Sequence, residues 1–152
     1  LHRVRERLVK SRTALVNEMR GFLLEYGITI NRGHADLRKK VPIFLCDEEA
    51  RLSDFFKGIL SELFNEYGDA CVRIKEEELK IRRVLSQNEP CKRLTKVPGV
   101  GPITATAIYA ASGDANVFKN GRHFSAWLGL VPKQASTGGK EILLGIIKRG
   151  DK

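Results

Sequence analysis

The chain has 152 residues, of which 42% are hydrophobic and 30% charged, and its formal net charge is +9 at pH 7. The length suits one domain, or a small domain with a long helical extension. The excess of Lys and Arg makes a polyanion the expected partner, with a merely soluble basic protein as the plainer alternative. No apolar run approaches the ~20 residues of a membrane-spanning helix, and no signal-peptide pattern is visible. We therefore expect a cytoplasmic protein without a membrane partner.

Cysteine and histidine spacing predicts neither disulfides nor a metal site in this chain. Cys46, Cys71 and Cys91 are odd in number and far apart, which favours free thiols. The three histidines are equally scattered, so no ligand cluster is readable from their spacing. Because the chain begins with Leu1 and stops directly after a helix-like segment, we expect an internal fragment of a longer protein.

Residues 1–88 are predicted to form a long, coiled-coil-like helical hairpin. Apolar spacing indicates a helix over 1–26 that Gly27 ends, a connecting loop with at most a short helix over 28–42, and a second helix over about 47–85 that Gly68 could interrupt. One row of the second helix recurs every eleven residues: Leu52, Leu63, Ile74 and Leu85. Such a stripe is too long for the first helix to bury. It predicts docking on a neighbour or assembly into a homo-oligomer, dimer or tetramer, through the long helices.

A turn-rich segment, residues 86–90, separates this region from a predicted second domain, residues 89–152. Gly, Ala and Thr become common there. We expect short helices over 91–96, 103–111 and 122–128, and an element of uncertain type over 143–148. The predicted fold class is therefore mainly α, a long helical hairpin followed by a small helical domain.

The segment Val97-Pro98-Gly99-Val100-Gly101 has the pattern of a helix-hairpin-helix motif. Glycines permit unusual backbone angles and let a phosphate approach the N–H groups that begin the next helix. Leu94, Val97, Val100 and Ile108 would pack the two helices together. Such a motif grips the nucleic-acid backbone without reading bases. The alternative is a Pro-Gly turn that only joins two core helices.

A polar segment, residues 133–140, follows Pro132 and contains Ser136-Thr137-Gly138-Gly139-Lys140. It lacks the first glycine and the final Ser or Thr of a Walker loop, so ATP binding is not predicted. A serine hydroxyl can attack a phosphodiester when a base removes its proton and cations clamp the phosphate. A flexible linker or a phosphate-binding turn explains the same residues, and the sequence leaves this choice open.

Taken together, these motifs resemble one known family. The chain from residue 94 onward, above all 97–105, 124–134, 136–140 and 148–151, is similar to the C-terminal domain of DEDD transposases of bacterial insertion sequences, the recombinases guided by a bridge RNA. The segment from residue 7 to residue 28 also resembles that family's central helical region. The match covers both ends of the chain.

The resemblance implies a DNA transposase that binds DNA and a guide RNA and uses a serine nucleophile for strand cleavage and exchange. That serine maps onto Ser136. It also implies Mg²⁺ held by acidic residues of a domain preceding Leu1, so Asp47, Glu48 and Glu49 are not metal ligands and this fragment alone is inactive, with no cofactor of its own. The expected nucleic-acid-binding residues are Gly99, Gly101, Thr104, Lys133, Thr137, Gly138, Gly139, Lys140, Lys148 and Arg149.

Two further readings stay open. A non-catalytic helix-hairpin-helix module on a dimerising helix predicts that Ser136 is dispensable and that binding falls with salt. A structural coiled-coil scaffold predicts no nucleic-acid binding even at low salt.

Overall fold

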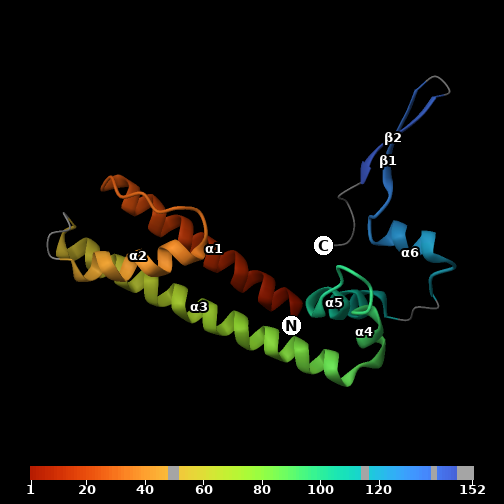
Figure 1. Ribbon diagram of the computed structural model, residues 1–152, viewed down its shortest axis with the longest axis horizontal. Coiled ribbons are helices and arrows are strands. Elements are labelled where there is room, and N and C mark those ends of the chain that lie inside the picture. Colours follow the sequence, from red (N-terminus) through yellow and green to blue (C-terminus); the bar gives the residue numbers. More distant parts are fainter. Residues whose placement is uncertain (48–51, 114–116, 138–139, 147–152) are drawn as a thin grey trace. The chain divides into compact units, whose positions relative to one another are not determined.

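The computed structural model describes residues 1–47, 52–113, 117–137 and 140–146, with the backbone alone described between 134 and 143 (Figure 1). These residues form six helices and one two-stranded antiparallel sheet, which confirms the predicted mainly α fold. Residues Leu1–Tyr109 and Ala110–Lys152 form two compact units. The expected division of the chain at residue 88 into an assembly region and a transposase domain stays a prediction.

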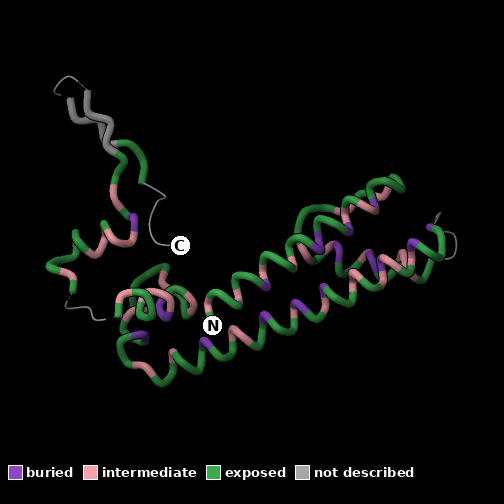
Figure 2. The backbone as a smooth tube through the Cα atoms, turned by 180° about the vertical axis from the view of Figure 1, so that it is seen from behind, coloured by how far each residue is buried: buried purple, intermediate pink, exposed green. Residues whose placement is uncertain are grey.

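The first unit is built on three helices. The helix α1 (His2–Glu25) runs antiparallel to α3 (Asp54–Gln87), and α2 (His34–Cys46) lies against both (Figure 1). Their shared core combines side chains of α1, α2 and α3 with Leu52: Leu15, Val16, Met19, Leu23, Leu37, Val41, Leu52, Phe56, Leu60 and Tyr67. Buried residues follow the contact between α1 and α3 along much of its length (Figure 2).

The first helix confirms its prediction closely. It ends at Glu25, and Gly27 takes a left-handed φ of 73°. The amide of Gly27 donates to the carbonyl of Leu24, and the amide of Ile28 donates to that of Leu23. These two bonds satisfy carbonyls that the helix end leaves unpaired, which is why a glycine stops the helix there.

The second helix corrects the sequence prediction, because residues 34–46 form a helix of 13 residues where a connecting loop with at most a short helix was expected to end at Pro42. Pro42 lies inside the helix and cannot donate to the carbonyl of Arg38, at a typical cost of about 3 kcal/mol. Leu37 and Val41 are both fully buried in the core. Burying two such side chains stabilises by about 1.5–3 kcal/mol each, which offsets the loss at the proline.

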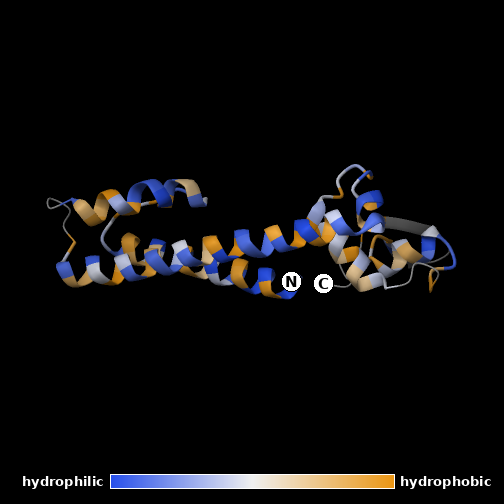
Figure 3. Ribbon diagram, turned by 90° about the horizontal axis from the view of Figure 1, so that it is seen from below, coloured by the Kyte–Doolittle hydropathy of each residue, from blue (hydrophilic) through white to orange (hydrophobic). Residues whose placement is uncertain are grey.

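The long helix α3 begins at Asp54, later than expected, and continues through Gly68 without interruption. Ser53 caps it, since its hydroxyl oxygen accepts the amide of Phe56 at 3.2 Å. Apolar and polar residues alternate along its ribbon (Figure 3).

Burial along α3 follows the predicted eleven-residue row only in part: Leu52 and Ile74 are buried, whereas Leu63 and Leu85 are half-buried. Four of the buried side chains of α3 recur every seven residues, at Leu60, Tyr67, Ile74 and Ile81. A seven-residue repeat keeps one stripe facing a partner helix. The partner within this chain is α1.

Two short helices complete the first unit. Asn88 ends α3 and caps α4 (Glu89–Leu94), because its side-chain oxygen accepts the amide of Cys91 at 3.3 Å. The helix α5 (Pro102–Ser112) follows, and the division between the two units falls near its end. Both helices lie close to their predicted positions.

The second unit contains α6 (Gly121–Trp127), β1 (Pro132–Thr137) and β2 (Lys140–Ile146). The helix was predicted, but the polar segment 133–140, expected to be a loop, contains a strand. Antiparallel pairing of β1 with β2 places Thr137 opposite Lys140. The sequence pattern explains this: β2 is rich in Ile and Leu, which favour strands, and a Gly-Gly pair separates the two strands, a preferred hairpin dipeptide.

Candidate functional site

The segment between α4 and α5 forms a compact turn in the first unit. Amides of Thr95 and Lys96 close the end of α4 on the carbonyls of Cys91 and Arg93, and the amide of Val100 donates to the carbonyl of Val97 at 3.0 Å. Gly99 has a φ of 85°, in the left-handed region. The turn thus requires a glycine at this one position.

The backbone of Gly101 differs from the prediction that both glycines of the turn take unusual angles. Gly101 is not one of the described glycines with a positive φ, so other residues can adopt its backbone angles. Its carbonyl accepts the amide of Ala105 at 2.9 Å, which opens α5. A Cβ atom at Gly99 or at Gly101 would meet no heavy atom within 4 Å, so both glycines leave open space beside the turn.

The first turn of α5 has the chemistry of an anion-binding helix end. Pro102 occupies the first helical position and no acidic residue follows in that turn. The amides of Ile103 and Thr104 have no intrahelical acceptor at such an end, and the helix dipole favours negative charge there. Thr104 is exposed, so a ligand can reach this turn.

Packing between α4 and α5 is looser than predicted. Ala105 is fully buried, but Val97 is 51% exposed and therefore contributes little to the contact. Leu94, Val100 and Ile108 are half-buried. The predicted apolar set is thus correct in part.

A polar contact ties α5 to the start of α1. The hydroxyl of Thr106 donates to the carbonyl of Pro102 at 2.8 Å, and the same oxygen lies 3.1 Å from Nε2 of His2. The tautomer of His2 sets which of these two atoms donates. Burial lowers the pKa of His2, and the positive charges of the N-terminus and Arg5 lower it further. We name the segment of residues 97–101 the glycine turn. The helix that follows it, α5, is therefore fixed to the helical hairpin.

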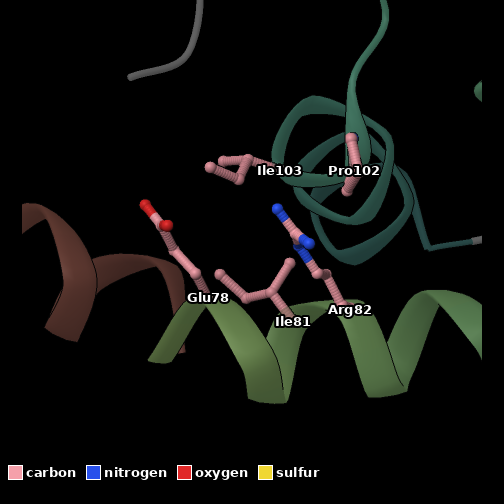
Figure 4. A pocket seen from close by; sticks show the side chains of 5 residues that line it. All are labelled: Glu78, Ile81, Arg82, Pro102 and Ile103. Carbon is pink, nitrogen blue, oxygen red and sulfur yellow. The ribbon is translucent and has the colours of Figure 1, made fainter. Parts of the chain in front are cut away.

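A small pocket lies where α3 meets α5 (Figure 4). Glu78, Ile81 and Arg82 of α3 line one side of the pocket, and Pro102 and Ile103 of α5 line the other. The carboxylate of Glu78 also pairs with Arg5 at 2.7 Å. The wall therefore contains one carboxylate and one guanidinium, that of Arg82, and it borders the first turn of α5 through Pro102 and Ile103.

The serine predicted to be catalytic lies in the second unit. Ser136 belongs to β1, and its Cα partner in β2 is Glu141. Its side chain lies outside the described residues, as do the side chains of Thr137 and Lys140. Lys133 is exposed in the same strand. Gly138, Gly139, Lys148 and Arg149 lie wholly outside the described residues.

The predicted residues therefore fall into two groups. Gly99, Gly101 and Thr104 belong to the first unit, whereas Lys133 and Ser136 belong to the second. The first group lies at the turn between α4 and α5, and the second group lies in the hairpin of β1 and β2.

An aromatic cluster that the sequence reasoning did not single out supports α6. Phe118 packs against His123, Phe124 and Trp127, with ring centroids 5.6, 5.0 and 5.3 Å away. The hydroxyl of Ser125 donates to the carbonyl of Leu130 at 3.0 Å. This bond ties α6 to the segment that leads into β1.

The structure also describes the cysteines, possible metal ligands and long helices of the chain. Cys46, Cys71 and Cys91 are free thiols, and burial raises the pKa of the Cys91 thiol. The described residues contain no group of three or more His, Cys, Asp or Glu side chains placed to bind one metal ion. Among the same residues, no helix combines the length and hydropathy needed to span a bilayer.

Part of the chain matches a known protein family. Residues 91–152 match the family described as Transposase IS116/IS110/IS902 family. Over this segment the chain is similar to that transposase family. The observed family thus agrees with the expected insertion-sequence transposase.

Relatives match almost the whole chain. The transposase for insertion sequence element IS1111A of Coxiella burnetii is 44% identical over 99% of the chain. The transposase for insertion sequence element IS1328 of Yersinia enterocolitica is 41% identical over 100%, and a probable family 20 transposase of Pseudomonas aeruginosa 45% identical over 99%. The chain spans 42%, 45% and 45% of the length of these three relatives. No solved structure gives a significant match.

Proposed function

We propose that this chain contributes a DNA-binding and strand-cleaving part to an IS116/IS110/IS902-type transposase. The observation that carries the proposal is the match of residues 91–152 to this family, together with relatives that cover the helical hairpin as well. The net charge of +9 fits a nucleic-acid partner.

The turn between α4 and α5 is proposed to grip the DNA backbone as a helix-hairpin-helix. Support comes from the left-handed Gly99, the open space beside Gly101 and the acid-free first turn of α5. A phosphate there would accept hydrogen bonds from the amides of Ile103 and Thr104. These contacts position DNA but carry no base specificity.

Ser136 is proposed as the nucleophile of strand cleavage. Its Oγ would bond to the phosphorus of the scissile phosphodiester while the bond from phosphorus to the leaving nucleotide oxygen breaks. A base takes the hydroxyl proton, and the leaving oxygen takes up a proton. The cations Lys133, Lys140, Lys148 and Arg149 are proposed to stabilise the charge that develops on the phosphoryl oxygens.

The remaining parts of the proposal concern groups beyond this chain. A guide RNA, Mg²⁺ bound by another domain and an oligomer formed through the long helices belong to the proposed transposase. The described residues do not supply a metal site, so the steps assigned here use only this chain's serine, cations and backbone amides.

A cleavage and strand-joining assay on the full-length transposase that contains this chain tests the proposal. Ser136→Ala is expected to abolish cleavage and joining while DNA binding persists. Ser125→Ala provides the matched serine control, since its hydroxyl donates to the Leu130 carbonyl of the same chain. Normal cleavage by the Ser136→Ala protein would exclude the nucleophile.

A second variant tests the DNA grip separately. Replacing Gly101 with Leu fills the open space beside the turn and is expected to weaken DNA binding, measured by gel shift at fixed salt, with α1 and α3 still folded. Loss of binding in this variant, combined with normal cleavage by Ser136→Ala, would favour the non-catalytic binding module. Unchanged DNA binding would exclude the turn as a phosphate grip.

A further inference from the structure

Several arginines gather in the first unit, away from the glycine turn. Three arginines, two on α1 and one on α2, surround the start of α2. Burial lowers the pKa of His34, and the three arginine charges lower it further. We name this group the arginine cluster: Arg12, Arg20 and Arg38 around His34 and Tyr67.

The cluster contains polar atoms that are buried and unpaired. The ring of His34 stacks on that of Tyr67, with centroids 6.0 Å apart and an angle of 17° between them. Tyr67 is only 2% exposed, yet its hydroxyl and Nδ1 of His34 have no hydrogen-bond partner among the described residues, and neither has Nε of Arg12 or of Arg20. Buried polar groups are nearly always paired in folded proteins. These four atoms therefore have hydrogen-bonding capacity that no described protein group uses.

Arg38 also lies close to Tyr67 and His34. The approach of the Tyr67 hydroxyl raises the pKa of the Arg38 guanidinium, although the geometry of the two groups falls short of a hydrogen bond. The guanidinium itself is exposed. The cluster thus has an open side through which an anion could enter.

No carboxylate neutralises the arginines within the described residues. Asp36, on the same helix as His34, accepts the amide of Asn31 at 2.9 Å and pairs with Lys40 at 3.1 Å. Arg20 instead donates to the carbonyls of Asn31 and Gly33, at 2.8 and 2.7 Å. These two bonds hold its guanidinium beside the first turn of α2, whose N-terminus has no side-chain cap and favours negative charge.

We propose that the arginine cluster binds a phosphate group. Guanidinium groups form strong, charge-assisted hydrogen bonds to phosphate oxygens, and the hydroxyl of Tyr67 adds a neutral donor. Donors that converge from three helices suit a tetrahedral anion with several acceptor oxygens better than a planar carboxylate. The phosphate is either free or part of a nucleic-acid backbone. The site uses neither Ser136 nor the glycine turn, so this proposal is tested independently of the proposed function.

Phosphate titration of the chain, followed by NMR of the His34 imidazole, tests the site. Inorganic phosphate replaces sodium chloride at constant ionic strength. Saturable shifts of the His34 signals and a higher His34 pKa are expected, because a bound anion offsets the arginine charges. Equal shifts with acetate, or shifts that do not saturate, would overturn the proposal.

Charge variants make the test specific. Arg12→Gln and Arg38→Gln are each expected to weaken phosphate affinity about tenfold, the size of one charge-assisted hydrogen bond. Arg73→Gln is the matched control, since Arg73 is exposed on α3 and lies outside the cluster. An equal loss of affinity in the Arg73→Gln chain would reduce the effect to net charge and overturn the site.

A short single-stranded oligonucleotide separates the two sources of phosphate. If the ligand is a nucleic-acid backbone, the oligonucleotide displaces inorganic phosphate and shifts the same His34 signals, and Arg12→Gln weakens both effects. If the ligand is free phosphate, the oligonucleotide leaves the His34 signals unchanged while phosphate saturates them. Either result supports a phosphate site, and the absence of both would exclude it.

Tyr67→Phe guards against a purely structural explanation. This variant keeps the stacked ring and removes only the hydroxyl. It is expected to weaken phosphate affinity several-fold without lowering the unfolding temperature of the free chain. A lower unfolding temperature with unchanged phosphate affinity would assign the hydroxyl a structural role and contradict the proposal.

Discussion

Nε2 of His2 and the Thr106 hydroxyl share a hydrogen bond of 3.1 Å, across 104 residues of sequence. This bond joins the first turn of α1 to α5, the helix that begins at the glycine turn. Thr106 is 4% exposed. The proposed DNA grip is therefore anchored to the helical hairpin by a buried polar contact.

Thr106→Val is expected to destabilise the first unit by about 1–2 kcal/mol, because it removes the hydrogen-bond partner of Nε2 of His2. Urea unfolding followed by circular dichroism measures the change. Thr104→Val is the matched control: Thr104 is exposed on the same helix, and its replacement should change the free energy of unfolding by less than about 0.5 kcal/mol. Equal effects of the two variants would contradict the anchoring role.

The folded chain is expected to lose stability as pH falls from about 7.5 to 5. Burial and nearby positive charges lower the pKa values of His2 and His34, so the unfolded chain binds protons at higher pH than the folded chain does. Stability from these groups is present above the unfolded value of about 6.5 and declines below it. Unfolding temperatures across this range measure the effect, and a His2→Gln/His34→Gln chain should show a flatter profile. A wild-type unfolding temperature that rises on acidification would be inconsistent with lowered pKa values.

Local signals explain which elements were predictable from the sequence. The stop of α1 at Gly27 and the cap of α4 by Asn88 depend on residues next to the helix ends, so short-range rules identify them. Pro42 misled the same rules. Its effect is local, whereas the burial of Leu37 and Val41 that outweighs it depends on α1 and α3.

The candidate sites divide in the same way. The glycine turn was readable because its residues are consecutive, although the backbone shows that Gly99 alone needs left-handed angles. The arginine cluster was not readable, since Arg12, His34 and Tyr67 come from three helices and no spacing rule connects them. Only the packing of α1, α2 and α3 brings these residues to one point.

Ile74 lies on the seven-residue stripe of α3 and is expected to carry a large share of the contact with α1. Its side chain is 4% exposed, whereas Val72 on the same helix is 56% exposed. Ile74→Ala should lower the free energy of unfolding by about 2–4 kcal/mol, from lost burial and the cavity that remains. Val72→Ala should cost less than about 0.5 kcal/mol. Similar costs in urea titrations of the two variants would mean that the stripe is misassigned.

The two glycines of the turn should respond differently to alanine. Gly99→Ala forces a Cβ onto a backbone with φ 85°, which costs about 1–2 kcal/mol. Gly101→Ala meets neither a left-handed φ nor a neighbouring atom, and is expected to cost less. Thermal unfolding of the two variants compares them, and a larger loss for Gly101→Ala would show that the turn has another geometry.

Removal of the Tyr67 hydroxyl should stabilise the ligand-free chain. The hydroxyl is buried without a hydrogen-bond partner among the described residues, and such a group costs about 1–3 kcal/mol. Tyr67→Phe keeps the ring that stacks on Phe64 and His34, so packing is preserved and the free energy of unfolding should rise by about 1 kcal/mol. Urea unfolding in phosphate-free buffer measures this gain. Added phosphate should reverse the order of the two chains, because the wild type then has a ligand for the hydroxyl and gains stability by mass action. A wild-type chain more stable than Tyr67→Phe without phosphate would mean that a protein group already pairs with the hydroxyl.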